Sequence, residues 1–176
     1  MINVIEKYGI KLLPVESSDA SFIISIRTDK RKSRFISATD ENVDSQVSWI
    51  NQYKTREKLN MEYYFIGVDE ENEKFGTYRI YNINDNNAEI GSWVTRPGYK
   101  KAQNAIKLDI IIKEFVFEQL GFEQLNFRVN KSNSSVLRYH KMFGPSILQE
   151  SEEEIFFLLR KDEFYRNRKV LFKNIK

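Results

Sequence analysis

AEIGSWVTRPGYKKAQNAIKLDIIIKEFVFEQLGFEQLNFRVN, residues 88–130, is the stretch that decides the fold. Residues 88–95 and 124–130 have the composition and alternation of strands. Between them, apolar residues recur with the spacing of one helix face. These apolar positions are Leu108, Ile111, Ile112, Phe115 and Val116. Gly121 is expected to cap the end of this helix. A strand, a helix and a second strand in this order predict a parallel pair with a right-handed crossover.

The flanking sequence extends this unit to one larger sheet. Two helices are expected after a first strand, and a three-strand antiparallel meander follows them, with turns at the DEENE and NDNN clusters. The expected strands are residues 10–15, 62–68, 74–83, 146–149 and 155–160, and the expected helices are residues 17–28, with Ser17 or Ser18 as cap, 41–58 and 133–143. The fold class is therefore α/β, with a mixed, mostly antiparallel sheet of about seven strands flanked by about four helices.

Composition limits the classes of protein that remain. The 176 residues are 41% hydrophobic and 30% charged, which is typical of one globular domain spanning 1–176. The chain has no cysteine and one histidine, so a disulfide framework and a multi-histidine metal site are excluded, and no metal is expected. No run of about 20 apolar residues is present, so no membrane span is expected, and the cytoplasm is the expected location.

The positive charge is concentrated in a basic tail, residues 160–176. This tail has seven Lys or Arg residues against Asp162 and Glu163. A basic patch alone is weak support for a nucleic-acid partner, which is not expected. A solvated tail or a subunit contact, as in a homodimer, is the preferred interpretation.

Three segments resemble the GNAT superfamily of N-acetyltransferases. They are AEIGSWVTRPG at 88–98, the loop and helix after it, and VNKSNSSVLRYHKMFG at 129–144. The resemblance covers nearly the whole chain and is closest to the branch with ribosomal-protein N-terminal acetyltransferases and bacterial amino-sugar or sugar-nucleotide N-acetyltransferases. It implies the GNAT acyl-CoA N-acyltransferase fold, with acetyl-CoA as the donor and direct acetyl transfer to a primary amine.

The resemblance also implies where the donor binds. The pantetheine arm would lie along the strand ending at Thr95, and the pyrophosphate would bind backbone N–H groups where the long helix begins. The cofactor-binding candidates are Trp93, Val94, Thr95, Lys100, Lys101, Ala102, Gln103, Asn104, Ala105, Asn130 and Asn133. The loop KKAQNA departs from the family pattern because the usual glycines are missing, and a non-catalytic interaction module is the alternative that this departure leaves open. Lys100 and Lys101 place positive charge at a helix N-terminus, where the helix dipole makes cations unfavourable. A bound anion would reverse this effect.

Glu89 is the candidate general base. It is charged within an apolar strand, and strand alternation puts it on one side with Gly91 and Trp93. The resemblance implies a glutamate in this region that takes the amine proton, directly or through water. The alternative is a paired carboxylate that fixes the neighbouring backbone.

His140 is the candidate acid for the departing thiolate. It stands seven residues after Asn133, where the family commonly has a tyrosine, and the spacing of two helical turns puts both residues on one helix side. An imidazole with its ordinary pKa near ~6.5 can donate a proton at neutral pH. A packing role for His140, with Tyr139 in the functional position, is the alternative.

The acceptor is expected to be a small-molecule amine. In the sugar-nucleotide enzymes an arginine-bearing stretch similar to IRTDKRKSRFIS, residues 26–37, borders the acceptor site. Arginine binds a diphosphate through paired hydrogen bonds, and aromatic faces stack on a base or sugar. The candidates are Arg27, Arg34, Tyr64, Arg79 and Tyr81. An amino sugar or nucleotide-linked amino sugar is therefore preferred, and a protein N-terminus of the ribosomal-protein type is the alternative.

Overall fold

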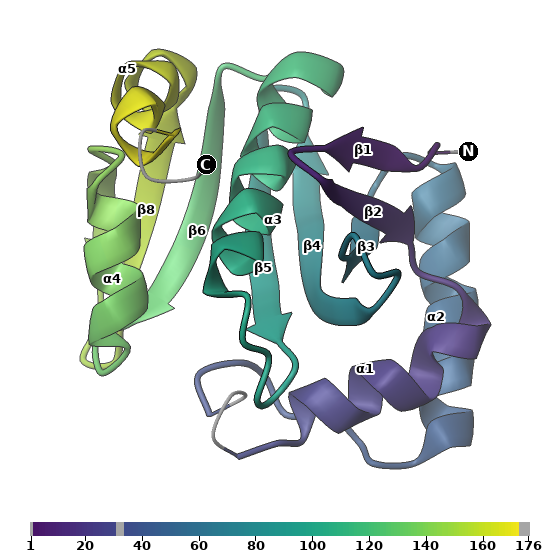
Figure 1. Cartoon of the computed structure of the whole chain (residues 1–176). Coiled ribbons are helices and arrows are strands. Elements are labelled where there is room, and N and C mark those ends of the chain that lie inside the picture. The colour runs from purple at the N-terminus through teal and green to yellow at the C-terminus, as the bar shows by residue number, and fades with distance from the viewer. Residues whose placement is uncertain (1, 31–33, 173–176) are drawn as a thin grey trace.

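Within residues 2–30 and 34–172, which the computed structural model describes, eight strands form one sheet (Figure 1). Their order is β1-β2-β3-β4-β5-β6-β8-β7, and neighbouring strands are antiparallel except β5 and β6. The strands are β1 Ile5–Lys7, β2 Ile10–Pro14, β3 Tyr63–Val68, β4 Lys74–Asn84, β5 Asn87–Thr95, β6 Gln124–Asn130, β7 Ser146–Glu150 and β8 Glu154–Arg160. This sheet confirms the predicted fold class.

Helices cover both faces of the sheet (Figure 1). In the described residues they are α1 Ala20–Arg27, α2 Val43–Lys58, α3 Ala102–Glu114, α4 Ser134–Lys141 and α5 Lys161–Phe172. Helices α1 and α2 pack on one face, and α3, α4 and α5 lie on the other. Helix α3 continues into a π-helical turn at Phe115–Gln119. None of the described helices is long and apolar enough to cross a membrane.

Strand β3 shows why the sheet carries two cores. Successive side chains of a strand point to opposite faces. Tyr63 and Phe65 belong to the large core under α3, whereas Tyr64 and Ile66 belong to the smaller core under α1 and α2. Because both faces of β3 are covered, its sequence YYFIGV is continuously apolar and all of its residues are buried.

Strand β5 bulges and then leaves its parallel neighbour. Gly91 pairs with Arg79 and Val94 with Thr77, so Ser92 and Trp93 together oppose one residue of β4. Ser92 has a φ of 54°, consistent with a β-bulge. Strands β5 and β6 pair only through their first residues, at Glu89 and Ile90 of β5, and then separate toward the lower edge of Figure 1.

The structure corrects three details of the predicted fold. Strand β1 was not predicted, and with it the described residues form eight strands rather than about seven. The first helix is entered through a short 3-10 turn, Ser17–Asp19, whose capping box is formed by Glu16 and Asp19 rather than by a serine side chain. The basic tail gives a fifth helix instead of a solvated segment.

Helix α5 is held to the core by an aromatic contact that the basic composition of residues 160–176 did not indicate. Phe164 is fully buried, and its ring packs against Phe117 and Phe143. Arg168 pairs with the buried carboxylate of Glu114 on α3. The interpretation of residues 160–176 as a solvated tail is therefore wrong for the helix that Phe164 anchors, and the alternative of a subunit contact stays a prediction. Residues 173–176 lie outside the described residues.

Candidate active site

A groove opens where β5 and β6 separate. Its inner part is a cavity of about 230 Å³ whose walls include Gly91 and Trp93 of β5, Asn130 of β6, and Asn133 and His140 at α4. The parallel pairing of the two strands has ended at this level, and the start of α4 and the β5 bulge frame the space.

The groove continues toward the beginning of α3. This outer part, a hollow of about 280 Å³, shares Trp93 and Asn133 with the inner part and adds Val94, Thr95 and Ala105. We call both parts together the β5/β6 groove. It brings six of the predicted cofactor residues to one place: Trp93, Val94, Thr95, Ala105, Asn130 and Asn133.

The residues of the β5/β6 groove fit acetyl-CoA. Beyond Ile90 the β6-side edge of β5 has no partner in β6, so its backbone groups can pair with the extended arm of the donor. The indole Nε1 of Trp93 is buried without a hydrogen-bond partner in the described residues. Helix α3 begins at Ala102, where helix N–H groups favour an anion such as pyrophosphate.

Two of the residues predicted to contact the phosphates, Lys101 and Asn104, have side chains that bind other protein groups. The Nζ of Lys101 lies 3.3 Å from Asp69, 3.0 Å from Glu70 and 3.3 Å from Glu71, all in the turn between β3 and β4. These hydrogen bonds, led by that of Glu70, raise the pKa of Lys101. The side-chain amide of Asn104 is buried and donates to Tyr99 Oη at 2.7 Å. The side chains of Lys101 and Asn104 are therefore occupied by protein groups.

Three other predicted phosphate contacts stay at the surface. Lys100, Ala102 and Gln103 are exposed at the start of α3, and none of them lines the groove within the described residues. In their place Arg34 lines the outer groove, with its guanidinium 4.5 Å from the ring centre of Phe35. Residues 31–33 of the same arginine-bearing stretch lie outside the described residues.

Glu89 is a paired carboxylate. It is 6% exposed and accepts hydrogen bonds from Tyr81 Oη at 3.2 Å, Asn82 Nδ2 at 3.0 Å and Arg128 Nε at 3.1 Å. Tyr81 and Arg128 line the inner groove, although Glu89 itself does not. Tyr81 and Arg128 are therefore the two groove residues that connect the groove with this carboxylate.

The expectation that Trp93 shares a face with Glu89 is wrong. The bulge at Ser92 reverses the alternation after Gly91. Trp93 therefore stacks on Tyr78, with ring centres 5.8 Å apart, on the α3 and α4 side of the sheet. Glu89 lies with Tyr81 on the opposite side.

His140 belongs to a cluster of buried polar groups behind the groove. Its ring lines the inner groove and is 3% exposed, and its Nδ1 lies 3.3 Å from Lys113 Nζ. Lys113 forms an ion pair with Asp109 one helical turn earlier on α3. Asp109 also accepts hydrogen bonds from Tyr78 Oη at 2.7 Å and Tyr139 Oη at 2.6 Å.

The ordinary pKa expected for His140 is contradicted. Burial, and then the charge of Lys113, lower the pKa of this imidazole to about 3, so it is neutral at neutral pH. The group that protonates the departing thiolate from this position is therefore not an imidazolium. Tyr139 does not replace it, because its hydroxyl is bonded to Asp109 and burial raises its pKa well above the usual value.

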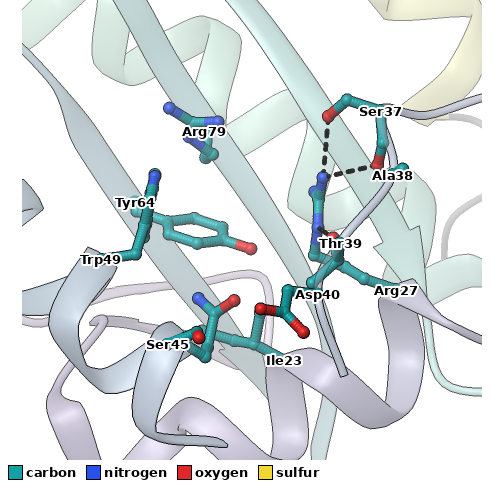
Figure 2. A pocket seen from close by; sticks show the side chains of 11 residues that line it. Ile23, Arg27, Ser37, Ala38, Thr39, Asp40, Ser45, Trp49, Tyr64 and Arg79 are labelled. Carbon is teal, nitrogen blue, oxygen red and sulfur yellow. Dashed lines mark hydrogen bonds between the residues drawn. The ribbon is translucent and has the colours of Figure 1, made fainter. Parts of the chain in front are cut away.

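A second cavity lies between α1, α2 and the sheet (Figure 2). This α1/α2 pocket has a volume of about 310 Å³, and Ser37 lines both it and the inner groove. Arg27 is 8% exposed; it donates to Thr39 Oγ1 at 2.6 Å and to Ser37 at 3.0 and 3.1 Å. Its Nη1 is buried without a hydrogen-bond partner, and it forms no ion pair within the described residues.

The opposite wall of the α1/α2 pocket contains Tyr64 and Arg79. The hydroxyl of Tyr64 points across the pocket toward Arg27 and is buried without a partner in the described residues (Figure 2). Arg79 differs, because its guanidinium pairs with the buried Glu62 and lies 4.9 Å from the ring centre of Trp49. The structure thus gathers Arg27, Tyr64 and Arg79 in one pocket, and places Tyr81 and Arg34 in the groove.

Sequence reasoning missed Asp109, Lys113 and Trp49. Asp109 and Lys113 did carry a signal, because two opposite charges four residues apart interrupt an otherwise apolar helix side. Trp49 carried none, because an isolated aromatic on an amphipathic helix is ordinary. In the described residues no three His, Cys, Asp or Glu side chains are grouped so as to hold a metal ion.

Comparisons with known proteins identify the family of the chain. The model of the acetyltransferase (GNAT) domain matches residues 10–145. The solved structure of apo FdhC, a nucleotide-linked sugar GNAT, is 29% identical, covers 100% of both chains and superimposes with a TM-score of 0.87. No curated protein matches the chain significantly.

Two more distant structures share the fold alone. Ribosomal-protein-S5-alanine acetyltransferase from Vibrio fischeri is 15% identical, over 93% of this chain and 99% of that one, with a TM-score of 0.77. Spermidine N-acetyltransferase from Vibrio cholerae, solved with CoA and spermine, is 15% identical, over 90% of this chain and 99% of that one, with a TM-score of 0.76.

Proposed function

This chain belongs to the GNAT acetyltransferase family and is an acetyl-CoA-dependent N-acetyltransferase, and from that premise we propose that it acetylates the amine of a sugar carried by a nucleotide. The β5/β6 groove receives the donor, which brings the acetyl group as an activated thioester. The α1/α2 pocket, which meets the groove at Ser37, receives the nucleotide part of the acceptor. The similarity to a nucleotide-linked sugar GNAT over the full length of both chains supports this assignment.

The buried guanidinium of Arg27 carries the proposal. A buried charge without a partner is unfavourable, and a guanidinium binds phosphate oxygens with short, strong hydrogen bonds. Arg27 has no carboxylate partner in the described residues. Arg27 and Tyr64 both line the pocket, and each has a buried polar atom without a hydrogen-bond partner among these residues, Nη1 and the hydroxyl. A diphosphate would supply the missing counter-charge. Arg79 is already neutralised by Glu62, so it shapes the wall.

Glu89 remains the proposed general base, acting through Tyr81. Tyr81 lines the groove, and its hydroxyl donates to Glu89. Burial and the neighbouring Glu89 raise the pKa of Tyr81 to about 12, so this hydroxyl is protonated at neutral pH. It can accept the amine proton while passing its own to the carboxylate. Glu89→Gln and Tyr81→Phe should each lower kcat about 100-fold; a kcat unchanged in either variant would remove the role.

An acceptor panel tests the proposed function. Acetyl-CoA would be offered with UDP- and dTDP-linked amino sugars, the same amino sugars unlinked, spermidine, and a peptide with a free N-terminus. We expect kcat/KM for at least one linked sugar to exceed that of its free sugar by tenfold or more. UDP or dTDP should compete with the acceptor and not with acetyl-CoA.

Other outcomes of the panel contradict the proposal. A preference for the peptide would favour the N-terminal acetyltransferase alternative, and equal rates for linked and free sugars would remove the nucleotide. Arg27→Lys is the matched control, because it keeps the positive charge but loses the paired hydrogen bonds of the guanidinium.

A further inference from the structure

Three ionisable side chains are packed together behind the inner groove. Asp109 and Lys113 are 0% exposed, and His140 is 3% exposed. Asp109 and Lys113 lie on helix α3 and His140 on helix α4, and side chains from the two helices meet. His140 lines the β5/β6 groove, whereas Asp109 and Lys113 do not.

The contacts of Lys113 fix the tautomer of His140. An ammonium group has three donors. In Lys113 one donates to Asp109, one faces His140 Nδ1 at 3.3 Å, and Nζ lies 4.1 Å from the ring centre of Phe143. Because Lys113 has nothing to accept with, Nδ1 must offer its lone pair, and the proton of the neutral imidazole is on Nε2.

The same contact orients the ring toward the reaction. His140 Nδ1 faces the interior, while the residue lines the inner groove. Nε2 makes no hydrogen bond within the described part of the chain, so its N–H is left for a group in the groove. Asp109 is held in place behind Lys113 by the hydroxyls of Tyr78 and Tyr139.

We propose that Asp109, Lys113 and His140 form a buried relay that delivers a proton into the groove as the acetyl group leaves its sulfur. His140 gives its Nε2 proton to the departing thiolate, and Nδ1 takes a proton from Lys113 at the same time. The imidazole is therefore neutral before and after the transfer. His140 is the catalytic residue, and Lys113 and Asp109 are positioning residues that act through it.

The protons balance over one turnover. The thiolate gains one proton, and Lys113 becomes a neutral amine beside Asp109. After the products leave, Glu89 releases the amine proton to solvent through Tyr81, solvent returns one proton to Nε2, and the proton at Nδ1 goes back to Lys113. Burial lowers the pKa of Lys113, although Asp109 opposes this, so its ammonium is a stronger acid than an exposed lysine. The relay depends on acetyl transfer from a thioester and not on the identity of the acceptor.

Nitrogen-15 NMR of the histidine ring tests the relay without any turnover. His140 is the only histidine of the 176 residues, so its ring signals are unambiguous. Between pH 5 and 8 we expect one neutral form with the proton on Nε2. A proton on Nδ1, or titration near pH 6.5, would overturn the proposal. In the double variant Asp109→Asn/Lys113→Met, which leaves neither charge unpaired, we expect a mixture of the two tautomers.

Steady-state kinetics with the best acceptor of the panel completes the test. His140→Gln and the double variant should each lower kcat at least 30-fold while acetyl-CoA affinity, measured by calorimetry, changes less than threefold. Wild-type kcat should fall at high pH as Lys113 loses its proton, and this limb should be absent from the double variant. Tyr139→Phe removes one of the two hydroxyls that hold Asp109, so kcat should fall by much less than in His140→Gln. A loss of kcat as large as that of His140→Gln, with the Nε2 tautomer intact, would make Tyr139 the donor instead.

Discussion

The end of α1 and the start of α3 each present a cation to a candidate binding site, and they differ in what surrounds it. Arg27, at the end of α1, is 8% exposed and bonded to neutral groups only, on Ser37 and Thr39. Lys101, just before α3, has a side chain 34% exposed and three carboxylates within 3.3 Å. The more buried cation is the one without a counter-charge.

This difference indicates which cation is free to bind a ligand. Removing an anionic ligand from Arg27 leaves a desolvated charge, so binding such a ligand is favourable there. At Lys101 a ligand would have to compete with Asp69, Glu70 and Glu71. A positive residue near a site is therefore a binding residue only where the fold has left it without a carboxylate.

Among the substitutions that test this difference, Arg27→Gln should have the largest effect, a loss of kcat/KM for the acceptor. Loss of a buried, charge-assisted hydrogen bond costs about 2–3 kcal/mol, which corresponds to a reduction of about 100-fold in kcat/KM for the acceptor. Acetyl-CoA affinity should stay within twofold, because Arg27 lies in the α1/α2 pocket. Steady-state kinetics and calorimetry measure the two quantities, and a loss confined to acetyl-CoA would place Arg27 in the wrong site.

Arg79→Gln should damage stability rather than acceptor recognition. It leaves the carboxylate of Glu62, 6% exposed, with the Nε of Arg56, at 2.7 Å, as its one remaining ion-pair partner among the described residues. We expect the free energy of unfolding in urea to fall by about 1–3 kcal/mol, since a buried charged group loses its main partner. Adding Glu62→Gln should restore part of this loss, and a double variant as unstable as the single one would contradict the pairing explanation.

Arg34→Ala should have a smaller effect, limited to the donor. Arg34 lines the outer groove near Ala105, where the pyrophosphate is proposed to bind. An exposed cation–phosphate contact is screened by salt, so acetyl-CoA affinity should fall about three- to tenfold at low ionic strength and less at high ionic strength. Calorimetry at two salt concentrations measures both; an effect that does not depend on salt would indicate packing instead.

Lys101→Ala should have the smallest effect. Its ammonium is bound by three carboxylates, so we expect acetyl-CoA affinity to change less than twofold. Lys100→Ala is the matched control, because Lys100 is exposed at the adjacent position. A tenfold loss in the Lys101 variant alone would mean that the donor displaces the carboxylates.

The strands and helices that line the site were predictable because their patterns are local. The alternation in Gln124–Asn130 gave the limits of β6 as the structure has them, and the helix spacing from Leu108 to Val116 gave α3. Helix α5 was missed because seven basic residues dominate residues 160–176, while its anchor is the single buried ring of Phe164. One buried aromatic is not a periodic pattern.

The candidate site was predicted less completely than the fold. Trp93 was predicted to contact the cofactor and it lines the groove, but it was assigned to the wrong face, since the bulge at Ser92 shifts the alternation by one residue. His140 was found through its spacing from Asn133, but its pKa depends on Lys113, 27 positions away in the sequence. Neither feature can be found from neighbouring residues.

The sequence by itself determined the order of the strands and helices other than β1 and α5, the family and the segments that form the groove, because periodicity and motif spacing are properties of consecutive residues. Only the tertiary structure decided which charges are paired. Asp69 reaches Lys101 from 32 positions earlier, whereas no carboxylate in the described residues reaches Arg27. The physical reason is that the free energy of a charged group depends on its burial and on partners within a few ångströms. Folding brings those partners from distant parts of the chain.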